Sequence, residues 1–182
     1  MPGKGKEKWP DKVRRYAGII ESTYPQLAGL EVRPVHEEGQ YNDALLVGET
    51  FIFRFPRYEA GIEMMRREVA FLRAVGGRTR LPIPEPSYAN LDSEKLGEIF
   101  MGYRLLPGKP LWRPAILGER DERVLDTWAQ QLAGFLKELH ALPADEFTDG
   151  WPASDSVGEW VEIEQLHQAV DIYQKIIKIR CC

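Results

Sequence analysis

Cysteine is nearly absent from this sequence. Its only two cysteines, Cys181 and Cys182, are the last residues of a chain of 182. Adjacent cysteines cannot easily join distant parts of a fold, and their spacing matches no set of metal ligands. The sequence therefore argues against a disulfide scaffold and against a zinc site.

Long apolar runs, a secretory signal and an excess of positive charge are missing too. No stretch approaches the ~20 apolar residues that span a bilayer, and the basic start has no apolar centre of the signal-peptide kind. The formal net charge is −4 and the pI is near 5.5, whereas binding to nucleic acid needs clustered Lys and Arg. We therefore expect a cytoplasmic protein with neither a membrane nor a nucleic-acid partner.

Apolar spacing and turn residues predict helices separated by strands. Asp11 is placed to cap a first helix that ends before Pro25, and helical spacing recurs in residues 61–75, 122–143 and, more weakly, 161–177. Strands are predicted in residues 30–35, 45–57 and 97–108, and a proline-rich extended connector in residues 81–88. This order predicts an α+β fold, with a small lobe in residues 1–106 and a helical segment in residues 107–182.

One predicted strand, "FIFRFPR", carries a cation among aromatic residues. Alternation along a strand places the three phenylalanines on one face, and Ile52 and Arg54 on the other. A buried charge without a partner is costly, and this applies to Arg54. It applies also to Glu68, which lies beside an apolar stripe on the next predicted helix and carries the opposite charge. Pairing Arg54 with Glu68 would solve both problems, although each side chain could instead reach solvent separately.

The order of these features resembles the small lobe of a protein kinase, and more closely the N-terminal part of the aminoglycoside phosphotransferase family. The matching stretches are "EEGQYNDALLVGETFIFRFPR", "REVAFLRAV", "LPIPEPSY", "GYRLLPGKPL" and "LAGFLKELHALP". The resemblance implies a kinase-like fold and transfer of the γ-phosphate of ATP, or GTP, with Mg²⁺, to a hydroxyl of a small molecule such as an aminoglycoside.

Carried over by position, the resemblance implies that Arg54 contacts the α/β-phosphates while Glu68 holds it. It implies that Tyr103 lies at the back of the adenine pocket, although core packing of this side chain is an open alternative. Two backbone segments complete the implied nucleotide site. A phosphate-covering turn is implied at Gly39, Gln40, Tyr41 and Asn42, and a hinge at Arg104, Leu105 and Leu106. The residues of the first segment could equally form a plain hairpin turn without a role in binding.

The catalytic loop of kinase-like enzymes, His-x-Asp-x-x-x-x-Asn, does not occur in the sequence. Its three histidines are followed by "EE", "AL" and "QA", so the catalytic Asp and the Mg²⁺ ligands of that loop are absent. We therefore expect a truncated form that binds nucleotide without useful kinase activity, its small-molecule acceptor being a partner of a full-length form. The alternative is a non-catalytic module that self-associates, or binds a partner, through exposed apolar surface.

Overall fold

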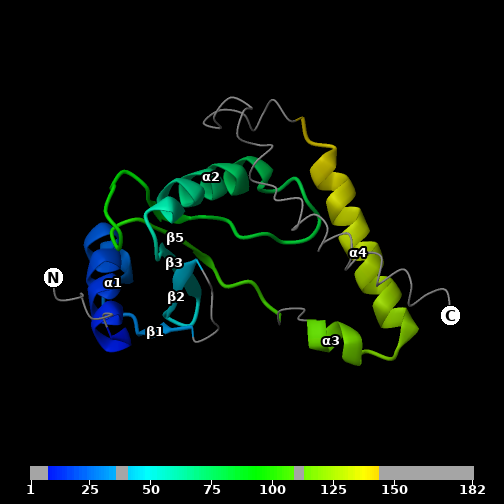
Figure 1. Ribbon diagram of the computed structural model, residues 1–182, viewed down its shortest axis with the longest axis horizontal. Coiled ribbons are helices and arrows are strands. Elements are labelled where there is room, and N and C mark those ends of the chain that lie inside the picture. The colour runs from blue at the N-terminus through cyan, green and yellow to red at the C-terminus, as the bar shows by residue number, and fades with distance from the viewer. Residues whose placement is uncertain (1–7, 36–40, 109–112, 144–182) are drawn as a thin grey trace. The chain divides into compact units, whose positions relative to one another are not determined.

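The computed structural model describes residues 8–35, 41–108 and 113–143. The chain divides into two units, residues 1–147 and residues 148–182, and all the described residues belong to the first. Figure 1 shows the order of its elements along the chain. The predicted helical pattern in residues 161–177 lies outside the described residues.

Five strands form one antiparallel sheet in the order β1-β2-β3-β5-β4. Their bounds are β1 Val32–Pro34, β2 Asn42–Val47, β3 Phe51–Pro56, β4 Tyr88–Asn90 and β5 Phe100–Arg104. The helices are α1 Trp9–Thr23, α2 Ala60–Val75, α3 Arg113–Gly118 and α4 Glu122–His140, with a 3-10 turn η1 at Pro25–Leu27. This is the predicted α+β class.

Two local predictions differ from the structure. Helix α1 begins at Trp9 with Lys8 as its N-cap, so Asp11 lies inside the first turn and does not cap the helix. Pro10 explains the earlier start, because proline fits the first helical positions, where the N–H needs no partner in the helix. Strand β4 begins at Tyr88, the last residue of the predicted connector, and pairs with β5.

The β2–β3 hairpin is closed by a tight turn at Gly48 and Glu49, which both have a φ of 56°. The N–H of Thr50 donates to the carbonyl oxygen of Val47 at 3.2 Å across this turn. Positive φ values at both central residues suit the right-handed twist of the flanking strands, and Thr50 completes a three-residue connection between the paired Val47 and Phe51. The turn fixes the register that pairs Ala44 with Arg54.

Alternation gives the sheet two different faces. On the α1 face, Phe53, Phe55 and Phe100 are fully buried, and the ring of Tyr16 from α1 stacks on Phe55 at 4.0 Å. Gly102 pairs with Phe53 across β3 and β5 on this face, where a Cβ atom would lie 2.6 Å from the Phe53 ring. The glycine is therefore needed to admit the ring.

The opposite face is covered by α2. Met65, Val69 and Leu72 of this helix pack with Ile99 and Met101 in a separate buried cluster. The helix ends at Val75, and its C-cap Gly76 donates its N–H to the carbonyl oxygen of Leu72, as the predicted glycine stop requires. The α2 face thus combines an apolar cluster with the charged pair described below.

Helix α4 begins with a capping bond, in which the carboxylate of Asp121 accepts from the N–H of Arg123. It is amphipathic, yet none of its residues is buried, and Leu132 and Leu136 on its apolar side are exposed. Within the described ranges, no helix is both long and apolar enough to cross a bilayer.

Candidate functional site

The structure brings Arg54 and Glu68 together on the α2 face of the sheet. Nη1 of Arg54 in β3 lies 2.6 Å from Oε1 of Glu68 in the middle of α2. The side chains are 24% and 38% exposed, so the pair is partly buried and partly accessible to water. A guanidinium placed in this way keeps donors that a phosphate group can use.

Tyr103 of β5 lies on the same face as this pair. The register sets Ile52 opposite Tyr103 and Arg54 opposite Met101, so the tyrosine is a diagonal neighbour of Arg54. Burial raises the pKa of the Tyr103 hydroxyl, the positive charge of Arg54 acts against this rise, and the negative charge of Glu68 adds to it. The hydroxyl therefore stays protonated beside the ion pair at neutral pH.

The predicted phosphate-covering turn is described only at its end. Gly39 and Gln40 lie outside the described residues. Tyr41 is exposed, and Asn42 opens β2 opposite Pro56 of β3. The end of the turn therefore lies two residues before Ala44, the strand partner of Arg54.

The predicted hinge follows directly after β5. Its central N–H is already engaged, because Leu105 donates to the carbonyl oxygen of Thr50 at 2.8 Å. The guanidinium of Arg104 lies over the ring of Phe51 at 6.0 Å, and Leu106 is half-buried. The base of a nucleotide would therefore have to form hydrogen bonds with backbone groups of this segment other than the N–H of Leu105.

A second charged group, Asp43 of β2, was not predicted from the sequence. Its side chain is 1% exposed and accepts from three donors: Nζ of Lys12 at 2.8 Å, the hydroxyl of Tyr16 at 2.9 Å and Nε of Arg57 at 2.7 Å. We call these four residues the Asp43 cluster. One sequence signal could have revealed it, because Asp43 has the same strand parity as the buried Leu45 and Val47.

The Asp43 cluster is electrostatically satisfied. Burial of the Asp43 carboxylate acts to raise its pKa, but the hydrogen bonds from Lys12, Arg57 and Tyr16 outweigh burial and lower the pKa below its ordinary value. Burial, together with the adjacent Asp43 charge, raises the pKa of Tyr16, so its hydroxyl remains a donor. The carboxylate is therefore ionised throughout the neutral range.

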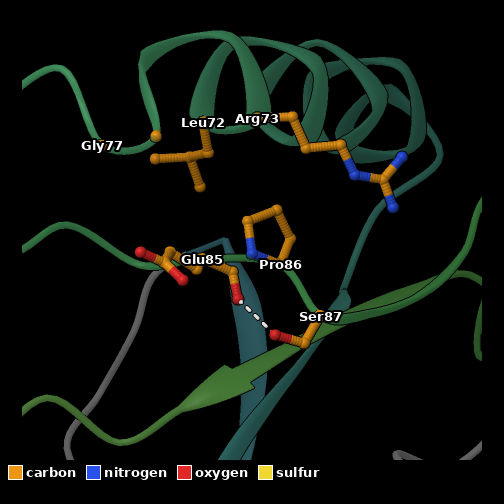
Figure 2. A pocket seen from close by; sticks show the side chains of 7 residues that line it. Leu72, Arg73, Gly77, Glu85, Pro86 and Ser87 are labelled. Carbon is orange, nitrogen blue, oxygen red and sulfur yellow. Dashed lines mark hydrogen bonds between the residues drawn. The ribbon is translucent and has the colours of Figure 1, made fainter.

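An open hollow of about 410 Å³ lies at the C-terminal end of α2, between this helix and the segment before β4. Figure 2 shows Leu72 above Pro86 in this hollow, with the Ser87 hydroxyl donating to the carbonyl oxygen of Glu85. Neither Arg54 nor any other predicted site residue lines it. The hollow is thus separate from the candidate nucleotide site.

A magnesium centre does not fit the part of the chain that the structure describes. No three His, Cys, Asp or Glu side chains there are grouped so that they could hold a metal ion. Arg54 and Glu68 form one ion pair, and Asp43 is occupied by its donors. The described residues therefore supply no set of ligands for Mg²⁺.

Most of the chain matches one known protein family. The model of the phosphotransferase enzyme family matches residues 31–178, which is most of the chain. The chain belongs to this family. The match includes the strand of Arg54 and the helix of Glu68.

Solved phosphotransferase structures share the fold. The GDP complex of wild-type aminoglycoside 2′-phosphotransferase-IIIa is 28% identical, with a TM-score of 0.71 over 87% of this chain and 51% of that chain. The GDP and kanamycin complex of APH(2″)-IIIa is likewise 28% identical, with a TM-score of 0.70 over 86% of this chain and 50% of that chain.

A third structure, the ADP-bound aminoglycoside phosphotransferase APH(2″)-Ib, is 23% identical, with a TM-score of 0.55 over 70% of this chain and 40% of that chain. At this identity the likeness supports the fold alone. This phosphotransferase-family chain therefore spans about half the length of the solved structures it matches. No curated protein matches it.

Proposed function

We propose that this chain binds a nucleoside triphosphate through Arg54, whose guanidinium contacts the α/β-phosphates while Glu68 holds it. The observation that carries the proposal is the 2.6 Å ion pair between β3 and α2, which stays partly open to water. An anion can approach the free side of such a guanidinium, because only part of its donor set faces the carboxylate.

The base and the phosphates would meet groups on either side of this pair. Tyr103 supplies a half-buried wall for the base, and the segment from Arg104 to Leu106 supplies backbone groups. Backbone N–H groups of residues 39–42 would cover the phosphates. Bound GDP in the structures that are 28% identical supports a nucleotide in this lobe, and both ATP and GTP are candidates.

Phosphoryl transfer to a small-molecule hydroxyl is proposed only for a form that also contains a catalytic loop. The sequence has no His-x-Asp, and transfer depends on positioning by that Asp together with metal-assisted charge stabilisation. Kanamycin in one matched structure makes an aminoglycoside a reasonable acceptor class. The cytoplasmic location and the self-associating alternative stay predictions.

Calorimetric titration with Mg-ATP and with Mg-GTP tests nucleotide binding, with Arg54→Ala as the variant. We expect affinity to fall about 10- to 100-fold, because a charged hydrogen bond contributes ~1.5–3 kcal/mol. The matched control is Arg33→Ala, which removes an exposed guanidinium paired with Glu49 in the same sheet. Absence of binding by the folded parent chain, or equal losses in both variants, would contradict the proposal.

A further inference from the structure

The connection between β3 and α2 is only residues 57–59, yet it joins the two elements that carry Arg54 and Glu68. A short connection transmits any displacement of its first residue to the start of the helix. The distance between the guanidinium and the carboxylate therefore depends on how this connection is held.

Arg57, the first residue of the connection, is tied to the sheet by two bonds. Its Nε donates to Oδ1 of Asp43 at 2.7 Å, and its backbone N–H donates to the carbonyl oxygen of Tyr41 at 3.0 Å. The Asp43 carboxylate is in turn held by Lys12 and Tyr16 of α1. One buried carboxylate thus joins α1, β2 and the start of the connection.

The N-terminus of α2 is held by the buried side chain of Ile62 and by its connection to β3. Its N-cap residue, Glu59, makes no side-chain capping bond. Gly61 in the first turn packs on Pro56, the last residue of β3, where a Cβ atom on the glycine would lie 3.1 Å from the proline Cβ. The fixed end of β3 therefore determines where the helix begins.

We propose that Asp43 is a positioning residue for the Arg54–Glu68 pair: its bond to Arg57 anchors the β3–α2 connection and so sets where Arg54 meets the nucleotide phosphates. Asp43 lies on the opposite face of the sheet from Arg54. Its side-chain hydrogen bonds come from Lys12, Tyr16 and Arg57, which are not among the predicted nucleotide contacts. This inference rests on the proposed nucleotide role of Arg54, and it assigns to the Asp43 cluster a function besides stability.

Asp43→Asn in the full chain tests the inference, because it removes the charge and keeps the size of the side chain. Affinity is measured by calorimetry for Mg-ATP or Mg-GTP, whichever the parent binds, and for the matching nucleoside. We expect triphosphate affinity to fall about five- to tenfold, as for a mutation along a coupled network, while nucleoside affinity is unchanged. A purely structural loss would lower both affinities together.

A double-mutant cycle with Arg54→Ala supplies the second readout. If Asp43 acts through Arg54, the Asn substitution causes no further loss of triphosphate affinity in the Arg54→Ala background. Equal losses for triphosphate and nucleoside, or additive losses in the cycle, would overturn the inference while leaving the proposed function intact. No triphosphate binding by the parent chain would overturn both.

The control is Glu49→Gln, the same carboxylate-to-amide change in an exposed ion pair at the other end of the β2–β3 hairpin. It should leave both affinities unchanged. If Asp43→Asn does not fold, Arg57→Met takes its place, since it removes the Asp43–Arg57 bond and leaves the bonds from Lys12 and Tyr16 to Asp43. A selective loss of triphosphate affinity in Arg57→Met supports the inference, and unchanged affinities overturn it.

Discussion

The two faces of the sheet each carry a carboxylate paired with an arginine, but in opposite surroundings. On the α1 face, Asp43 is 1% exposed and has three donors. On the α2 face, Glu68 is 38% exposed and bonds Arg54. A buried carboxylate must satisfy its acceptors within the protein, whereas a half-exposed one shares them with water. The first arrangement suits a structural joint and the second a site that receives a ligand.

Removal of the buried Asp43 carboxylate should have the largest effect on stability. Asp43→Ala leaves the Tyr16 hydroxyl buried without its acceptor and two cations without their anion. We expect the free energy of unfolding to fall by about 3 kcal/mol. Urea denaturation measures this change, with Glu49→Ala as the exposed control. A loss no larger than that of the control would contradict the assignment of a structural role to Asp43.

The pH dependence of the same variant checks the cause. The pKa of Asp43 is lower in the folded chain than in the unfolded chain. The contribution of its carboxylate to the free energy of unfolding is therefore fully present above the unfolded pKa of about 3.9, and it is lost as the pH falls through the folded pKa. The parent chain should therefore lose stability in acid more steeply than Asp43→Ala. Parallel acid curves would show that the carboxylate charge is not what stabilises the cluster.

Packing on the α1 face is tested by Gly102→Ala, with an intermediate effect. The added Cβ would lie 2.6 Å from the ring of Phe53, which is fully buried and cannot withdraw. We expect a loss of about 1–3 kcal/mol in the free energy of unfolding, as for overpacked cores. Gly18→Ala in α1, where nothing lies within 4 Å, is the matched control and should be neutral or stabilising.

The α2 face should respond least in stability. Glu68→Gln removes a charge that is 38% exposed, and ion pairs open to solvent contribute little. We expect less than about 1 kcal/mol of change in the free energy of unfolding, measured by urea denaturation beside Asp43→Ala. A loss of stability as large as that of Asp43→Ala would show that the Arg54–Glu68 pair is as structural as the Asp43 cluster.

The sequence predicted what depends on local pattern. The glycine stop of α2, the β2–β3 hairpin and the approach of Glu68 to Arg54 all follow from alternation, helical spacing and turn residues over a short stretch of chain. Prediction of the pair was possible because only 14 positions separate its members. Each signal belongs to one element or to two consecutive elements.

Long-range features could not be predicted in this way. The bonds from Lys12 and Tyr16 to Asp43 span 31 and 27 positions, and no local pattern selects those partners. Strand β4 has only three residues, and its place in the sheet depends on pairing with β5. The start of α1 was misplaced because Asp11 is a common capping residue, while Pro10 moves the helix start to Trp9.

The tight turn at Gly48 and Glu49 also has a consequence for folding kinetics. The three-residue connection that contains this turn closes the β2–β3 hairpin with a small loss of loop entropy, so these strands can pair in microseconds. Joining α1 to Asp43 must instead close a much longer loop. The strand that carries Arg54 can therefore form within a local nucleus, whereas the Asp43 cluster forms later in folding.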